Sequence, residues 1–441
     1  MEMASASLEG LGELAIHEII SKLGPKDAAV LGCVNKRFRV SASEEIIWSK
    51  LCSHDLDLSS PTDPFGNPAP SFKAAYQIWR EEFSMYPWSL VKRVKRCWGS
   101  LKNWMAMNFP ESGNTLRKGA TEDDIKAVEE SLRVKLPLPM KVLYRLCDGQ
   151  DIKSHNSGLG LIGGYSFYDH NVNVCLLPLS EVITATKEFV SHLGFSNRSK
   201  LVVVAASSTH IEKLFFMNCI NGQLCVGTSN LLADGETVHC VPKQLVRSVH
   251  GVGGGEPQDG MLLWLEEHNR RLHSGMIQVH EVEKVKSINL FPEAAPLCST
   301  SVTHGVKIRA SAVFVPELSD LQEEYEKYWF SYSIRMSLSQ EGGQVNGMPF
   351  NSCQLYWRHW IIRADDDVVS DVNGEAVIGK YPLLSPDGQE FVYQSCTPIS
   401  SPTGSVEGSF TFVPGRLTNP LSSPFRVEAG NFPLKLPECV F

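Results

Sequence analysis

Two glycine-rich stretches have the residue types and spacing that could hold a phosphate. Gly158, Gly160 and Gly163 match the G-x-G-x-x-G pattern of dinucleotide-binding loops, and "GEAVIG" at 374–379 is a degenerate copy. Such a loop works only between a strand and a helix whose amino-terminal amides point at the ligand. The first stretch instead follows helical patterns and precedes aromatic and β-branched residues without helix formers. We therefore expect glycines that serve turns and close strand packing rather than a nucleotide.

Other candidate catalytic or metal-binding residues lack the partners that such chemistry needs. His359 lies inside an expected strand without a nucleophile or carboxylate in a recognisable arrangement, so we expect a packed, hydrogen-bonded histidine. Asp365, Asp366 and Asp367 are consecutive and would point apart in a hairpin loop rather than converge on a metal. The 12 cysteines form no C-x-x-C pair, which favours reduced thiols over a zinc site. The sequence therefore predicts no enzyme activity, no cofactor and no metal.

Length and charge narrow the class of protein. A chain of 441 residues should divide into two to four domains. The formal net charge of −8 argues against nucleic acid or an anionic membrane as the main partner. The compact basic run "KRVKR" at 92–96 is typical of a solvated helix face, with nuclear targeting as the alternative. Without a signal-peptide pattern or an apolar run of membrane length, we expect a protein of the cytoplasm, the nucleus or both.

Alternation of apolar and polar residues marks the carboxy-terminal third, which we expect to form one domain from 299 to 441. One run places these apolar side chains on one face of a strand: Phe330, Tyr332, Ile334, Met336 and Leu338. A second run alternates Cys353, Leu355, Trp357, His359 and Ile361. Strands of this kind, separated by Gly- and Asp-rich turns and without crossover helices, predict an all-β sandwich.

Several short motifs in this third resemble the ApaG domain. They are "RHW" at 358–360, "GEAVIG" at 374–379, "PLL" at 382–384, "FVYQS" from 391 and "PTGSVEGSF" at 402–410. The resemblance implies a fibronectin- or immunoglobulin-like sandwich with a binding surface rather than an active site. That family usually has glycine where this chain has Ala376, whose Cβ would obstruct a phosphate.

The middle of the chain combines two helical patterns with later strands. Thr121 is a typical N-cap, and acidic residues follow it in the first turn. Residues 113–275 resemble the SUKH (Smi/Knr-like) domain, mainly through Ile125, Leu136, Pro137, Leu143 and Gly149. The resemblance implies an α+β interaction module without catalytic residues. A linker is expected to follow it from 276 to 298.

Three short helical patterns occupy residues 8–55. Gly24 and Pro25 separate the first two, and Ser43 is expected to cap the third. A segment of this size cannot bury so much apolar surface alone, so the helices must pack on the rest of the chain or on a partner. A helical linker region is expected from 56 to 112.

The amino-terminal pattern resembles an F-box, through "CVNKRF" at 33–38 and the apolar residues spaced before and after it. Gly12 lies where that family usually has proline. The resemblance implies binding to a Skp adaptor and, through it, to cullin and RING subunits. The residues expected at the adaptor contact are Leu11, Leu14, Ile19, Ile20, Leu23, Leu31, Val34 and Trp48.

The order F-box, SUKH-like domain and ApaG domain is similar to that of the F-box/ApaG proteins of the plant Skp-interacting-partner type. It implies a multidomain α+β protein that serves as the non-catalytic substrate-recognition subunit of a Skp–cullin–F-box ubiquitin ligase. Two alternatives stay open at this point. One is an interaction scaffold outside any ligase, and the other is a small-ligand or anion sensor that uses the sandwich.

Overall fold

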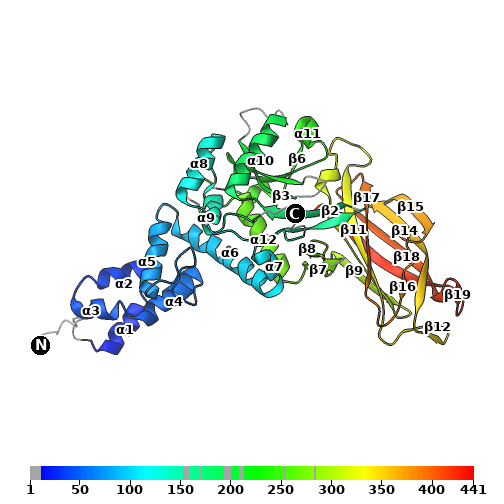
Figure 1. Ribbon diagram of the computed structural model, residues 1–441, viewed down its shortest axis with the longest axis horizontal. Coiled ribbons are helices and arrows are strands. Elements are labelled where there is room, and N and C mark those ends of the chain that lie inside the picture. The colour runs from blue at the N-terminus through cyan, green and yellow to red at the C-terminus, as the bar shows by residue number, and fades with distance from the viewer. Residues whose placement is uncertain are drawn as a thin grey trace, which may run out of the picture.

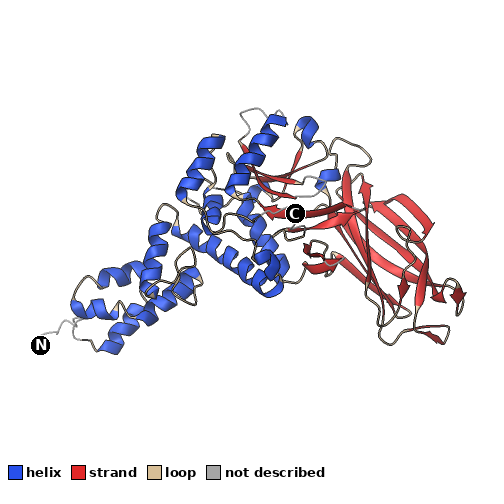
Figure 2. Ribbon diagram, in the orientation of Figure 1, coloured by secondary structure: helices blue, strands red, loops and turns tan. Residues whose placement is uncertain are grey.

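The architecture changes from helical to all-β along the chain. A computed structural model describes residues 11–151, 158–168, 170–192, 200–207, 213–247, 249–251, 255–282 and 285–441. Figures 1 and 2 show helices at the amino-terminal end, a mixed region in the centre and strands at the far end. The predicted multidomain α+β class is confirmed by this arrangement.

The described amino-terminal segment has four helices, where the sequence predicts three. Asn35 makes the difference, because its side chain accepts a hydrogen bond from the Phe38 amide and starts an additional helix. The expected cap by Ser43 is not formed, and its hydroxyl accepts from Lys73 instead. The helices are α1 (Glu13–Ser21), α2 (Pro25–Leu31), α3 (Lys36–Ser41) and α4 (Glu45–Leu56).

The next three helices join this segment to the centre of the molecule. They are α5 (Phe72–Glu82), α6 (Trp88–Asn108) and α7 (Pro110–Gly113). Ser71 caps α5 through its hydroxyl, which accepts from the Ala74 amide. Among the described helices none combines the length and apolar character needed to cross a bilayer. The apolar face of α6 belongs to the main hydrophobic core, so the expected helical linker is an integral part of the body.

A single eight-stranded sheet organises the centre, in the order β6-β5-β4-β3-β2-β1-β8-β7. All neighbouring pairs are antiparallel except β1 and β8. The helices of this region are α8 (Glu122–Leu132), α9 (Leu138–Leu146), α10 (Leu179–His192), α11 (Leu231–Asp234), η2 (Lys243–Leu245) and α12 (Gly260–His273). The strands are β1 (Gly163–Phe167), β2 (His170–Leu176), β3 (Leu201–Ser207), β4 (Leu214–Asn218), β5 (Leu224–Gly227), β6 (Thr237–His239), β7 (Gln278–Val282) and β8 (Val285–Asn289).

The stretch from 276 to 298, expected to be a linker, extends this sheet. It contains β7 and β8, and Asn289 of β8 pairs in parallel with Gly164 of β1. Sequence periodicity did not reveal this hairpin because its strands are short and polar. The middle region therefore includes strands on both sides of α12 in the chain.

The carboxy-terminal region consists of two packed sheets and a small two-stranded sheet, β12-β13. One packed sheet has the order β17-β11-β10-β9, and the other has the order β15-β14-β18-β19 with β16 paired to β14 and β20 paired to β18. Their aromatic side chains meet between the sheets, where Tyr332 contacts Trp360 and Phe432. The elements are β9 (Cys298–Thr303), β10 (Val306–Phe314), η3 (Pro316–Leu318), β11 (Tyr328–Leu338), β12 (Gly343–Val345), β13 (Met348–Phe350), β14 (Cys353–Ala364), β15 (Asp367–Glu375), β16 (Leu383–Leu384), β17 (Phe391–Ile399), β18 (Thr403–Arg416), β19 (Asn419–Pro420) and β20 (Phe425–Lys435). The predicted sandwich is confirmed.

The predicted faces hold for β11 but fail for β14. A register shift between Leu355 and Trp357 marks a β-bulge, which reverses the alternation beyond it. Trp360 and Ile362 are therefore buried, whereas Trp357, His359 and Ile361 are only half-buried. The prediction that these last three share the face of Leu355 is wrong for this reason.

Candidate protein-interaction surfaces

The eight residues expected at the adaptor contact fall into three groups. Leu14, Ile19 and Val34 are exposed, with Leu14 at 88 %. Leu11, Leu23 and Leu31 are half-buried around a small core of the helical segment. That core consists of Ile16, Ile20, Ala28, Phe38, Ala42 and Ile47.

The other two of the eight, Ile20 and Trp48, are already covered by the chain itself. Ile20 is fully buried in the small core, and Trp48 is only 2 % exposed. The Trp48 indole donates to the Ala42 carbonyl at 2.7 Å, and its ring lies 5.5 Å from that of Tyr76. Both residues therefore hold the helical segment together, and the surface open to a partner contains the exposed group.

The basic run at 92–96 lies on α6, and it is not the solvated helix face that the sequence predicts. Lys92 forms an ion pair with Asp55 at 3.2 Å, and Arg93 forms a bidentate pair with Glu266 of α12 at 2.7 Å. Burial lowers the pKa of Lys95. Lys92 and Arg93 thus fasten α6 to its neighbours, and Lys95 is partly buried. Arg96 is the one cation of the run that is exposed.

The first glycine stretch packs strands and holds no phosphate loop. Gly163 has φ = +82°, and a Cβ there would lie 2.3 Å from the Ile288 carbonyl oxygen. A Cβ on Gly164 would lie 1.6 Å from the Val172 carbonyl oxygen. The stretch runs directly into β1, and the hairpin to β2 follows instead of a helix. The prediction of close strand packing is confirmed.

The second stretch is a closed turn. Ala376 has φ = +63° and is 4 % exposed, so its methyl group fills the place where the related family has glycine. Its carbonyl accepts a hydrogen bond from Arg358 at 3.0 Å, and Val377 pairs with Lys380 across the turn. The side chain of Ala376 therefore occupies space that an approaching anion would need.

The remaining candidates for chemistry form hydrogen bonds within the fold. His359 makes a 2.9 Å contact with Asp371 on the adjacent strand, as expected of a hydrogen-bonded strand histidine. Asp365 lies in the predicted hairpin loop, and its carboxylate accepts hydrogen bonds from the hydroxyls of Ser401 and Thr403. Over the described ranges no group of three or more His, Cys, Asp or Glu side chains could hold a metal. All 12 cysteines are free thiols, and most are buried.

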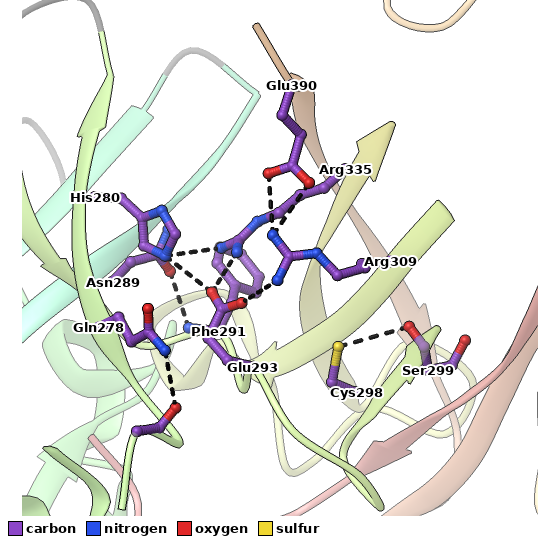
Figure 3. A network of polar contacts seen from close by, with 11 residues as sticks. Gln278, His280, Asn289, Phe291, Glu293, Cys298, Ser299, Arg309, Arg335 and Glu390 are labelled. Atoms are coloured by element: carbon purple, nitrogen blue, oxygen red, sulfur yellow. Dashed lines mark hydrogen bonds and ion pairs between the residues drawn. The ribbon is translucent and has the colours of Figure 1, made fainter. Parts of the chain in front are cut away.

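A buried charge cluster fixes the sandwich against the middle region (Figure 3). Glu293, which follows β8, contacts His280 of β7 at 2.9 Å, Arg309 of β10 at 3.0 Å, and Arg335 of β11. Arg309 also pairs with Glu390 at 3.0 Å. Burial alone would raise the pKa of Glu293, but the hydrogen bond from His280 and the charge of Arg335 outweigh it and lower that pKa to about 2.

The end of the chain returns to the middle region, which sequence reasoning missed. The Trp264 indole donates to the Val440 carbonyl at 2.8 Å, and the Phe441 ring stacks on Trp264 at 5.3 Å. The ammonium of Lys213 is fully buried and donates to the Phe441 carbonyl and to the Tyr165 hydroxyl, each at 2.6 Å. The sequence did offer one signal, since Lys213 directly precedes the apolar run of β4. A lysine buried beside such a strand requires polar partners, which distant segments of the chain must supply.

Known proteins match this arrangement over nearly its whole length. The sequence profile of the ApaG domain matches residues 319–414, and that of the SMI1/KNR4 family (SUKH-1) matches residues 119–224. The F-box protein SKIP16 of Arabidopsis thaliana is 57 % identical over 438 residues, covering 98 % of this chain and 100 % of that protein. The chain belongs to the family of SKIP16-like F-box proteins.

More distant relatives match nearly the whole chain or one part of it. Human F-box only protein 3 is 25 % identical over 418 residues, which cover 93 % of this chain and 80 % of that protein. The protein ApaG of Nitrosomonas europaea is 37 % identical over 110 residues, or 25 % of this chain and 77 % of that protein. The expected combination of an F-box protein with SUKH and ApaG domains is confirmed.

Proposed function

We propose that this SKIP16-like F-box protein is the substrate-recognition subunit of a Skp–cullin–F-box ubiquitin ligase. Its amino-terminal helices bind a Skp adaptor, which links the chain to cullin and RING subunits. The SUKH and ApaG domains hold the target protein. The chain supplies no catalytic group, and it works by keeping a target lysine close to the ubiquitin carrier.

The observation that carries this proposal is the exposed apolar side chains at the free end of the molecule. Leu14, Ile19 and Val34 lie on the helical segment, which projects away from the body in Figure 1. Apolar side chains that are exposed close together are typical of a surface that a partner protein covers. Beneath them the helices bury a small core of their own.

Capture of the purified full-length chain by a purified Skp adaptor tests the proposal. Leu14→Asp and Ile19→Asp should each weaken capture by at least about 30-fold, since a central apolar contact is worth about 2 kcal/mol or more. Both side chains are exposed, so the melting temperature should not change.

Val302→Asp on β9 is the matched control, because Val302 is also an exposed aliphatic side chain but lies in the sandwich. It should leave capture unchanged. A wild-type chain that the adaptor does not retain would refute the proposal. Equal retention of wild type and Leu14→Asp would place the adaptor contact elsewhere.

A further inference from the structure

A cleft of about 500 Å³ lies between α6, the loop that follows α4 and the segment before α8. This volume is within the range of ligand sites, roughly 300–1,000 Å³. One wall is the loop from Leu58 to Gly66, and the opposite wall is the segment from Gly113 to Gly119. Lys95, Trp98, Gly99 and Lys102 of α6 line it between the two walls.

The charges that line this cleft are positive, although the chain as a whole carries −8. The cationic lining residues are Lys95, Lys102, Arg117 and Lys118, and the one acidic lining residue is Asp63. The carboxylate of Asp63 accepts hydrogen bonds from the Phe65 and Asn67 amides at 2.9 and 2.8 Å. It is therefore engaged in stabilising its own loop, although it also lines the cleft.

Three of the four cations take part in no ion pair within the described parts of the chain. Arg117 pairs with Asp148 at 3.1 Å, whereas Lys95, Lys102 and Lys118 form no ion pair there. Lys95 is held over the Trp79 ring at 5.7 Å. Burial lowers the pKa of Lys95 and the nearby charge of Lys102 adds to the lowering, while Asp57 opposes it. An anion placed between these ammonium groups would offset both the burial of the Lys95 charge and its repulsion by Lys102.

The walls of the cleft are held in place by hydrogen bonds and are partly apolar, and both features indicate which kind of anion would bind. Trp79 donates to the Thr62 carbonyl at 2.9 Å and so fixes the loop wall to α5. Phe65 and Trp98 add aromatic surface beside the cations. Ammonium groups interleaved with apolar side chains suit a short acidic peptide better than a bare inorganic ion. The overall negative charge disfavours a long nucleic-acid backbone.

We infer that this cleft binds an acidic segment of a target protein, with closely spaced carboxylate or phosphate side chains set between Lys95, Lys102 and Lys118. The inference rests on the proposed function, because it names the class of target that the receptor would hold. It places target binding between the helices that follow the F-box and the SUKH domain, where no motif in the sequence points.

Fluorescence anisotropy with the purified full-length chain, without any adaptor, tests the inference. The probes are a labelled peptide with a short run of glutamates, the same peptide with phosphoserines in that run, and the same peptide with glutamines. At least one of the two anionic peptides should bind, and the glutamine peptide should not. Binding should weaken as salt is raised, because exposed charges are screened. The anionic peptide that binds identifies the carboxylate or the phosphate as the source of charge.

Two kinds of variant separate the cleft from other surfaces. Lys102→Glu combined with Lys118→Glu should lower affinity by at least about 10-fold. Lys307→Glu on β10 is the matched control at an exposed lysine outside the cleft, and it should change nothing. Gly99→Met keeps every charge and favours the helix, yet extends a side chain into the cleft beside Lys95, so it should also weaken binding. Gly99→Ala should retain it, because a Cβ there meets only the Lys95 ammonium, at 3.5 Å.

Each result decides the inference. Binding of neither anionic peptide, binding that the lysine and Gly99→Met variants leave intact, or equal binding of single-stranded DNA would overturn it. Binding of inorganic phosphate, measured by calorimetry, without binding of either anionic peptide would reduce the cleft to a small-anion site and would also overturn it. Adaptor capture is measured separately, so loss of the ligase role and loss of the cleft remain distinguishable.

Discussion

Replacing Glu293 with glutamine should destabilise the junction between the SUKH and ApaG domains, and more so at neutral than at acidic pH. The side chain of Glu293 is 7 % exposed and contacts His280, Arg309 and Arg335. Without its charge, the buried guanidinium of Arg335 loses its counter-ion. Removing one member of a buried pair is costly because the other charge stays desolvated.

The size of the effect follows from the pKa of Glu293. Its lowering from 4.5 to about 2 corresponds to at most about 3.4 kcal/mol, since one pKa unit is worth about 1.4 kcal/mol. Solvent screening at the edge of the junction reduces the expectation to about 2–3 kcal/mol. Because the folded-state pKa is depressed, this contribution is complete above about pH 5 and is lost as the pH falls towards 2.

Urea unfolding of wild type and Glu293→Gln at pH 7 and pH 3, followed by tryptophan fluorescence, measures this contribution. The difference in unfolding free energy should be about 2–3 kcal/mol at pH 7 and should shrink by about 1–2 kcal/mol at pH 3. Glu390→Gln is the control, because Glu390 is 31 % exposed and should cost less than about 1 kcal/mol. A Glu293 variant as stable as wild type at pH 7, or a difference independent of pH, would refute the reasoning.

Two further predictions concern the core of the middle region. Gly164→Ala places a Cβ 1.6 Å from the Val172 carbonyl oxygen and should cost about 3 kcal/mol or more. In the control Gly12→Ala the Cβ meets open space, so only the preference for glycine at the N-cap of α1 is lost, and the cost should stay below about 1 kcal/mol in thermal unfolding. Equal melting temperatures would show that β1 and β2 do not pack as described. Burial lowers the pKa of His268 from 6.5 to about 4, so the wild type should lose up to about 3 kcal/mol of stability as the pH falls from 6.5 to 4. His268→Gln should flatten the stability–pH curve in that window, and an unchanged slope would contradict the burial of a neutral imidazole.

Local patterns were enough to predict elements whose residues interact with near neighbours in the chain. The Thr121 hydroxyl accepts a hydrogen bond from the Asp124 amide at 3.1 Å, and the Asp124 carboxylate accepts one from the Thr121 amide at 2.8 Å, so α8 begins where the sequence predicts. In β11 the apolar side chains from Phe330 to Leu338 share one face, as their alternation predicts. The glycines at 158–163 were assigned to strand packing because the strand and helix required by a phosphate loop were missing from their flanks.

Contacts between distant segments decided what the patterns left open. The polar face of β11 carries Ser331, Ser333 and Arg335, yet all three are buried because the middle region covers that face. The Ser331 hydroxyl donates to the Ser166 carbonyl at 2.6 Å. Alternation alone cannot distinguish a face that meets solvent from one that meets another domain.

The candidate adaptor surface also depends partly on local sequence patterns and partly on tertiary packing. The sequence by itself determined that the amino-terminal helices carry more apolar side chains than they can bury alone, because composition and helical spacing are local properties. Only the tertiary structure decided that Ile20 and Trp48 are covered by the chain while Leu14, Ile19 and Val34 are not. The tertiary structure also decided that Lys95, Lys102 and Lys118 line one cleft. Their spacing in the sequence does not indicate where α6 meets the segment before α8. Which side chains share a surface depends on how helices and sheets pack, and that is set by the whole core.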